Sequence, residues 1–370
     1  MKPNARSVLT ALRKVEALPA PVRVVATGHG PVLRHNAAEL LGRYSSWSTA
    51  ALAKAASCVC VLYPADYGFA DRLSQSLARG LTKTDAEVVM LDSLHADAQE
   101  VAEAVAKASA LVVLCPPSSS SSPVSPALAA ALASVRPGQR VLLAESYGGS
   151  DEPVDTLAAS LISAGASIAG PALRVRELPG EGVYQAYEEA GTDLGQALRA
   201  GESLKAQKGG MPAALSKALG RLSGGLYVVT ASRGDARSAM VASWVAQAAF
   251  SPPSITVAVA KDRAIERLMQ VGDSFVLNCL PEGGETAPLM KHFLRRFAPG
   301  ADRFGGVAWT PASGCGAPIL DAAVAFVECT VASRMEAGDH WVVLATVSDG
   351  SVMRPDVKTA VHTRKIGSYY

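Results

Sequence analysis

The sequence lacks the features that mark nucleic-acid-binding, membrane and secreted proteins. Its formal net charge is only +2 and no long run of like charge stands out, which argues against a dedicated nucleic-acid binder. No apolar run reaches membrane-spanning length, and the N-terminus has no signal-peptide core. We therefore expect neither a nucleic-acid partner nor membrane insertion.

Cysteine is also scarce and shows no pattern. The six cysteines include no CxxC pair, and most lie in apolar, strand-like runs. Small core residues in a reducing compartment explain this better than a disulfide framework or a zinc site. The densest basic stretch, at 291–303, contains Phe293 and Phe297 at helical spacing, which favours a helix with one wet and one buried face.

Apolar material is plentiful. The chain has 370 residues, of which 49% are hydrophobic, so two or three domains with sizeable cores are expected. Residues 1–50 are too few for an independent domain. They predict a helix at Arg6–Ala17, a strand at "VRVVAT" and a helix at Ala37–Trp47, as the tail end of a larger fold.

Residues 56–200 alternate between apolar strands and amphipathic helices. The strand candidates are "CVCVLY", "EVVMLD", "ALVVLC", "RVLLAE" and "ASIAGPALRV". This alternation predicts an α/β domain with a doubly wound parallel sheet, whose ligand crevice lies beyond the carboxyl ends of the strands. Loops 64–70, 116–126 and 146–153 would lie there. The serine-rich second loop could be a flexible linker, but its place directly after a strand favours a binding loop.

A linker at about 200–212 separates this region from a mainly β pattern. Alternation and β-branched residues predict an antiparallel barrel. We expect helices at "SKALGRL", "MVASWVAQAAF" and "AIERLMQVG".

The stretch 230–263 is the most informative for chemistry. Its hydroxyl groups at Thr230, Ser232, Ser243 and Ser251, with Lys261 at a strand end, suit a bound anion. Asn278 adds an amide, and His362, Arg364 and Lys365 lie close together near the end of the chain. Each residue alone is most simply a surface or capping group, but their joint order on a β pattern favours a binding site.

The order of motifs resembles the flavodiiron proteins of oxygenic phototrophs. The matching segments are "GGLYVVTA", "ASWVAQAAFSPP", "VAVAKDR", "GDSFVLN", "KHF", "FAPGADRF", "GDHWVV" and "AVHTRKIG". The resemblance implies that 51–205 form a flavodoxin-like domain and 209–370 a flavin reductase-like split β-barrel. Residues 1–50 would be the end of a di-iron domain of metallo-β-lactamase-like fold.

Family resemblance also implies a function. Electrons would pass from NAD(P)H or a photosynthetic, ferredoxin-like donor through FMN to a di-iron centre that reduces O2 to water. His29 matches the last iron ligand, but the upstream HxExDH motif is absent. Because one imidazole cannot hold two irons, we expect no terminal O2 chemistry and no catalytic residue in this chain, which reads as a truncated piece of a longer protein.

The flavodoxin phosphate loop departs from the family pattern. Where the family reads like YxSxYGNT, this chain reads "YPADYGFA", so Ala65 and Ala70 replace two hydroxyl residues and Asp66 adds a negative charge. The third loop reads "SYGGSDE", with Gly149 in place of a stacking aromatic. We expect weak or absent FMN binding there, unless Asp66 points outward and backbone amides alone hold the phosphate. The remaining candidate contacts are Tyr67, Gly68, Ser118, Ser119, Tyr147 and Gly148.

The reductase-like region shows no comparable loss, so we expect it to bind FMN. No GxGxxG or Walker loop is present, and a nicotinamide would therefore dock by stacking on the flavin. The predicted flavin contacts are Thr230, Ala231, Ser232, Ala242, Ser243, Trp244, Val245, Ser251, Lys261, Asn278, His362 and Arg364.

Two functions follow from the resemblance. The chain is either the electron-input part of a flavodiiron oxygen reductase or a non-catalytic, weakly flavinated scaffold. The family pairs related subunits, so we expect a homo- or hetero-oligomer with a flavodiiron paralogue. The expected location is the chloroplast stroma or, alternatively, the bacterial cytoplasm.

Overall fold

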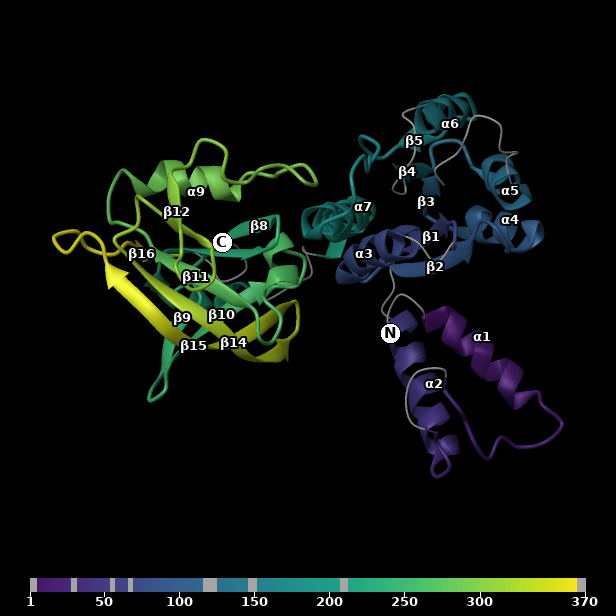
Figure 1. Ribbon diagram of the computed structural model, residues 1–370, viewed down its shortest axis with the longest axis horizontal. Coiled ribbons are helices and arrows are strands. Elements are labelled where there is room, and N and C mark those ends of the chain that lie inside the picture. The colour runs from purple at the N-terminus through teal and green to yellow at the C-terminus, as the bar shows by residue number, and fades with distance from the viewer. Residues whose placement is uncertain are drawn as a thin grey trace. The chain divides into compact units, whose positions relative to one another are not determined.

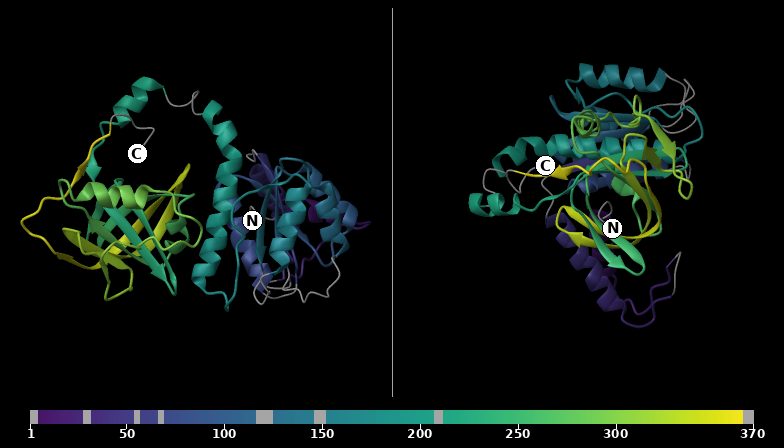
Figure 2. Two further views of the ribbon diagram at one scale, coloured as in Figure 1. Left: turned by 90° about the horizontal axis from the view of Figure 1, so that it is seen from above. Right: turned by 90° about the vertical axis from the view of Figure 1, so that its left-hand side faces the viewer.

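The structure, a computed structural model, describes residues 5–27, 32–53, 57–65, 69–115, 125–145, 152–206 and 212–364. The chain divides into two compact units. Unit 1 comprises Met1–Pro179 and Ala190–Gly201, and unit 2 comprises Gly180–Glu189 and Glu202–Tyr370. Figure 1 labels their elements, and Figure 2 gives two further views. No helix in the described ranges is long and apolar enough to cross a membrane.

The N-terminal segment is a pair of packed helices, α1 (Ala5–Glu16) and α2 (Ala37–Ala53). The predicted strand at "VRVVAT" is wrong, because only one isolated bridge, between Val25 and Leu33, forms there. Apolar alternation favours a strand, but a strand needs a continuous neighbour to pair with, and this segment has none among the described residues.

Unit 1 contains a five-stranded parallel sheet in the order β2-β1-β3-β4-β5. This is the flavodoxin-like order. From β1 the chain adds β2 on one side and then crosses back to add β3, β4 and β5 on the other. The last strand is shorter than predicted, since Gly170 and Pro171 follow it and proline cannot donate to a ladder. The strands are β1 (Cys58–Tyr63), β2 (Glu87–Asp92), β3 (Ala110–Cys115), β4 (Arg140–Glu145) and β5 (Ser167–Ile168).

Helices connect these strands, as the sequence predicts. On α3 the predicted apolar row of Leu73, Leu77 and Leu81 is fully buried. Asp97 and Ser125 cap α4 and α5, their side chains accepting hydrogen bonds from backbone N–H groups of the first turn. The helices are α3 (Phe69–Lys83), α4 (Ala98–Lys107), α5 (Pro126–Ser134), α6 (Glu152–Ser163) and α7 (Glu181–Ala206).

Within unit 1, α7 lies very close to α3. A Cβ at Gly191 would be 2.1 Å from the carbonyl oxygen of Leu77, so only glycine fits at this helix crossing. Thr192 donates a hydrogen bond to the carbonyl of Gly80 nearby.

Unit 2 is built on a seven-stranded sheet in the order β8-β7-β11-β14-β15-β10-β9, and every pairing is antiparallel. Two short pairs, β12–β13 and β6–β16, accompany it. The strands are β6 (Gly224–Gly225), β7 (Tyr227–Arg233), β8 (Ala236–Ala242), β9 (Val245–Phe250), β10 (Pro253–Ala260), β11 (Ser274–Cys279), β12 (Trp309–Pro311), β13 (Pro318–Leu320), β14 (Ala325–Ala337), β15 (His340–Val352) and β16 (Val361–His362).

One predicted helix of unit 2 is wrong. The segment "MVASWVAQAAF" forms the end of β8 and all of β9, with Ser243 and Trp244 at the break. Buried and more exposed residues alternate along β8, which is the period of a strand, but alanine and valine in short runs fit either structure. The helical elements of this unit are α8 (Ala213–Leu219), the 3-10 helix η3 (Ala264–Leu268) and α9 (Thr286–Leu294).

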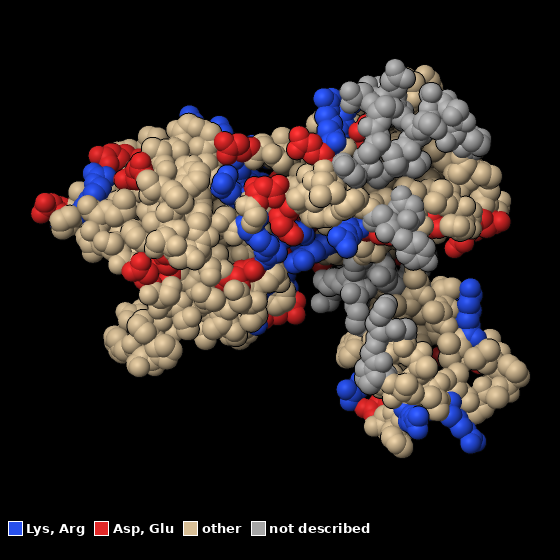
Figure 3. Space-filling view, in the orientation of Figure 1, with Lys and Arg blue, Asp and Glu red and all other residues tan. Residues whose placement is uncertain are grey.

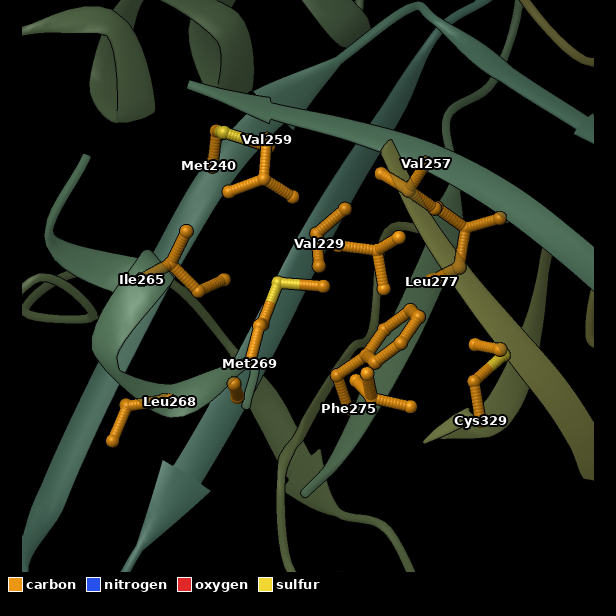
Figure 4. Packing of buried hydrophobic residues seen from close by; sticks show 14 of the residues in the cluster. Val229, Met240, Val257, Val259, Ile265, Leu268, Met269, Phe275, Leu277 and Cys329 are labelled. Carbon is orange, nitrogen blue, oxygen red and sulfur yellow. The ribbon is translucent and has the colours of Figure 1, made fainter. Parts of the chain in front are cut away.

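The core of unit 2 lies between the sheet and η3. Figure 4 shows Phe275 near Val229, Leu277 and Met269, with Ile265 and Leu268 on the η3 side. Phe275 and Ile265 are fully buried.

Residues 180–189, the start of α7, pack within unit 2, which the sequence analysis did not foresee. Gly182 N donates to Asp235 Oδ1 at 3.0 Å, so the β7–β8 turn caps the helix. Arg267 forms ion pairs with Glu181 and Glu188, both at 3.0 Å. Arg303 pairs with Glu189 at 2.8 Å.

Candidate functional site

The predicted flavin contacts are spread along the β7–β8 hairpin, with Thr230 midway, opposite Ala239, and Asn278 on β11, opposite Val228. Ser232 pairs with Arg237 near the turn, whereas Tyr227 pairs with Ala242, directly before Ser243. Five residues of strand separate the two levels, roughly 17 Å at the usual rise per residue. A ligand that touched both ends would have to extend along the hairpin.

Thr230 and Asn278 are fully buried and bonded to each other. Asn278 Nδ2 also donates to the carbonyls of Val228 and Pro318, and its Oδ1 accepts from Leu320 N at 2.8 Å. Thr230 Oγ1 donates to the same Pro318 carbonyl. These bonds account for both side chains as ties between β7, β11 and β13. Their contact with a flavin stays a prediction.

The neighbours of Thr230 offer little more to a ligand. Ala231 is fully buried, and Ser232 Oγ donates to the carbonyl of Cys315 at 3.3 Å. The end of the hairpin near the turn is therefore already engaged in internal bonds.

The break between β8 and β9 gathers another group. The guanidinium carbon of Arg364 lies 5.1 Å from the ring centre of Trp244. The ring centre of His340 lies 5.1 Å from the same Trp244 ring centre. Trp244 remains 39% exposed, so part of its ring can meet a ligand. This arrangement presents an aromatic surface beside a permanent positive charge.

Ser243 contributes a buried hydroxyl to this group. Its residue is only 7% exposed, and its Oγ has no hydrogen-bond partner. A buried polar atom without a partner is costly, so a ligand atom or water is expected there. Ala242 is buried and Val245 half-buried on either side.

The short pair β6–β16 closes the group from another side. His362 pairs with Gly224, and a Cβ at Gly224 would lie 2.3 Å from the carbonyl oxygen of Ser243. Glycine at 224 thus allows β6, the partner of the C-terminal strand β16, to approach the β8–β9 break. Burial and then the Arg364 charge lower the pKa of His362 from its ordinary value, so its imidazole is neutral at pH 7.

Two predicted contacts lie apart from this group or are already paired. Ser251 is exposed in the turn between β9 and β10. Lys261 Nζ bonds to Glu336 Oε1 at 2.5 Å and lies 5.1 Å from the ring centre of Trp341. Lys365 falls outside the described residues.

The predicted flavodoxin contacts Tyr67, Gly68, Ser118, Ser119, Tyr147 and Gly148 all lie outside the described residues, as do Asp66, Gly149 and His29. The neighbouring described residues show an acidic edge. Ala65 N donates to Asp92 Oδ1 at 3.0 Å, so the carboxylate already uses one amide of the first loop. Burial, followed by the charges of Asp71 and Asp92, raises the pKa of Tyr63 at the end of β1.

No cluster of three or more His, Cys, Asp or Glu side chains that could hold a metal ion occurs within the described ranges. Sequence reasoning missed His340 and Gly224 as members of the unit 2 group. Both lie in motifs quoted for the family resemblance, "GGLYVVTA" and "GDHWVV", but only the pairings of β15 with β10 and of β16 with β6 bring them to this group.

Comparison with known proteins agrees with this architecture. Residues 219–368 match the family model described as "Flavin reductase like domain". Diflavin flavoprotein A 1 of Synechocystis sp. PCC 6803 is 51% identical over 370 residues, covering 100% of this chain and 64% of that protein. The chain thus spans about 64% of the length of this curated relative.

Solved structures are similar to parts of the chain. A flavodoxin-like domain from Synechococcus sp. is 46% identical, covering 38% of this chain and 97% of that one, with a TM-score of 0.36. The Flv1 flavodiiron core from Synechocystis sp. PCC6803 is 33% identical, covering 54% of this chain and 50% of that one, with a TM-score of 0.48. The predicted family and fold class are confirmed: the chain is a homologue of the C-terminal part of the cyanobacterial diflavin (flavodiiron) flavoproteins, with a flavodoxin-like domain followed by a flavin reductase-like domain.

Proposed function

We propose that this chain is an electron-input portion of a flavodiiron oxygen reductase and that it relays electrons through a single FMN held by unit 2. The observation that carries the proposal is the group at the β8–β9 break, where an exposed aromatic ring, a guanidinium and a buried unpaired hydroxyl meet. A flavin nucleotide needs such partners, since it combines a flat aromatic ring with an anionic phosphate.

Each residue of the group has a distinct part. Trp244 offers a ring surface for stacking, Arg364 offers charge to the phosphate, and Ser243 Oγ offers a hydrogen bond. His362, neutral at pH 7, adds no second positive charge and can accept or donate one hydrogen bond. A bound flavin supplies the exchange between two-electron and one-electron transfer.

Unit 1, by contrast, binds FMN weakly in this proposal. Asp71 and Asp92 both act on Tyr63 at the end of β1, where phosphate binds in flavodoxin-like sheets. Each carboxylate near that point opposes an anion, and Ala65 offers no hydroxyl in return.

The donor is NAD(P)H or a ferredoxin-like protein, and the di-iron chemistry lies outside this chain. The partner is a flavodiiron paralogue or another copy of the chain. Because the similar diflavin flavoprotein is cyanobacterial, we favour the bacterial cytoplasm over the chloroplast stroma.

Flavin stoichiometry tests the proposal. The full chain is saturated with FMN and dialysed, and the flavin-to-protein ratio is read from absorbance. We expect about one FMN per chain, falling by about tenfold or more in affinity for Trp244→Ala/Arg364→Ala, since charge-assisted bonds and stacking each contribute about 1–3 kcal/mol. Lys217→Ala, an exposed cation of the same unit, is the matched control.

Retention of two FMN per chain would contradict the weak site in unit 1, and full retention by the double variant would contradict the site in unit 2. A colourless chain that still pairs with a paralogue would favour the scaffold function instead.

A further inference from the structure

His362 differs from the rest of the group at the β8–β9 break because both of its ring nitrogens are open. It lies half-buried on β16, opposite Gly224 of β6. Neither ring nitrogen has a hydrogen-bond partner among the residues that the structure describes. A neutral imidazole with open nitrogens can take up a proton on one of them and give it to water.

The charged and titratable neighbours in the group have fixed roles. Arg364 keeps its positive charge at any pH near neutrality and lies over the Trp244 ring. The imidazole of His340 is bonded through Nδ1 to Asp339 Oδ1 at 2.8 Å and lies against the same ring. The protonation of His340 is therefore tied to a carboxylate, whereas His362 is free to exchange a proton with a ligand.

In the described part of unit 2, the elements that adjoin His362 add no negative charge that would hold it protonated. β6, β16 and the break between β8 and β9 contain no Asp or Glu. The Tyr227 hydroxyl oxygen lies 2.2 Å from the position of a Cβ at Gly225, and burial, followed by the charge of Cys279, raises the pKa of Tyr227, so it stays neutral. Lys217 on α8 is exposed, where its charge is screened.

Charges farther away have little weight in this titration. Figure 3 shows blue and red side chains scattered over the visible face of unit 2, without a large patch of one sign. Long-range fields from that face are therefore weak in salt solution, and the immediate neighbours decide the protonation of His362.

Electron relay through a flavin leaves one proton to be removed. A hydride donor such as NAD(P)H delivers two electrons and one proton together. A one-electron acceptor then removes the two electrons in turn, and the proton stays behind until a base takes it. The relay proposed for unit 2 therefore needs a proton acceptor beside the cofactor, with a route to water.

We propose that His362 is this acceptor: its neutral imidazole takes up the proton that a hydride leaves at the cofactor and passes it to solvent. The inference rests on the flavin site proposed above and adds a proton-transfer step to it. The N–H bond formed on the imidazole replaces the bond broken at the cofactor, and both electrons go to the one-electron acceptor, so atoms and charge balance.

The surroundings of His362 suit a base that is used again in every cycle. Burial and then the charge of Arg364 lower the pKa of His362, so the imidazole is neutral before each turnover. Once protonated, it is a cation beside the guanidinium, and repulsion between the two positive charges favours release of the proton to water. The half-buried position leaves part of the ring open to solvent for that release.

Anaerobic reoxidation of the full chain tests the proposal. The FMN-loaded chain is reduced with one equivalent of dithionite, so that the identity of the donor does not matter, and is mixed with ferricyanide, a one-electron acceptor, over a range of pH. We expect the reoxidation rate of the parent chain to fall as pH drops through the pKa of His362, because a protonated imidazole cannot accept a proton. His362→Gln, which keeps hydrogen-bonding groups but does not titrate, should be about a hundredfold slower at pH 7, with no such step in its pH profile.

Chemical rescue separates a proton-transfer role from a structural one. His362→Ala should be as slow as His362→Gln, and free imidazole in the buffer should restore its rate in proportion to the neutral form of the added base. His95→Gln, which removes an exposed histidine of unit 1, is the matched control and should keep the parent rate and pH profile. Circular dichroism and the flavin-to-protein ratio verify that each variant is folded and loaded.

A parent-like rate and pH profile in FMN-loaded His362→Gln, or a slow His362→Ala variant that imidazole leaves unchanged, would overturn the proposal. A variant that loses affinity for FMN but keeps its affinity for riboflavin would also overturn it, because His362 would then be a phosphate contact. A parent chain that holds no FMN in unit 2 would overturn the flavin site as well, and the flavin ratio reveals this before any rate is measured.

Discussion

The two units differ in the charges that surround the ends of their strands. In unit 1, the end of β1 is flanked by Asp71 and Asp92, and the Ala65 amide is already bonded to a carboxylate. In unit 2, Arg364 lies over Trp244 beside an unpaired hydroxyl at Ser243. With the weak flavin site that we propose for unit 1, retaining a fold and retaining a binding site are separate matters, because a site depends on a few groups at strand ends.

The largest expected effect is a loss of unfolding free energy in unit 2 alone, on replacement of Asn278. Replacing Asn278 with Ala leaves the buried Leu320 N–H without its partner and removes the ties to Thr230 and Val228. We expect unit 2 to lose about 1–3 kcal/mol of unfolding free energy, while the unfolding of unit 1 is unchanged. Denaturant unfolding of the full chain measures both.

The same Asn278 variant also decides between two roles of this residue. If it is structural, as its hydrogen bonds indicate, FMN affinity at low denaturant stays within about twofold of the parent. A much larger fall in affinity with the fold intact would restore Asn278 as a flavin contact.

Gly224→Ala should weaken FMN binding by unit 2 without removing a charged group. Its Cβ would meet the Ser243 carbonyl at 2.3 Å, so β6 and the β8–β9 break must move apart. We expect FMN affinity to fall by about tenfold, about 1.4 kcal/mol, measured by fluorescence titration. Gly284→Ala, where no atom lies within 4 Å of the added Cβ, should leave affinity unchanged.

The smallest effect is a shift in titration. Arg364→Ala removes a positive charge beside His362, so the pKa of His362 should rise towards its ordinary value of 6.5 while burial still holds it lower. NMR titration of the imidazole measures this directly, and an unchanged pKa would show that Arg364 does not act on it.

The unfolding free energy of the parent chain should depend on pH through the titration of His362. Because the folded state takes up the His362 proton at a lower pH than the unfolded chain, its contribution is complete above pH 6.5 and is lost as pH falls through the folded pKa. Arg364→Ala should make this loss smaller.

Sequence patterns predicted the fold well where the apolar residues recur with a clear helical or strand spacing. The apolar row of α3 and the continuous strands β1, β3 and β4 are as predicted, because burial on one helix face or both sheet faces leaves a clear pattern. The segment 240–250 was misassigned as a helix, since small apolar residues fit both periods and pairing with β10 decided the outcome.

Of the predicted flavin contacts, the structure places Ser243, Trp244, His362 and Arg364 around the β8–β9 break. Thr230 and Asn278 lie in an internal hydrogen-bond network. His340 joins through strand pairing alone. The domain boundaries and individual flavin contacts stay predictions.

The sequence by itself determined the kind of each unit, the family and the chemical character of the strand ends, because periodicity and residue type are local properties. Only the tertiary structure decided which hydroxyls form internal hydrogen bonds and that residues 180–189 pack in unit 2. These depend on contacts between segments distant in the chain, and strand register, which sets them, is fixed by the packing of the whole core.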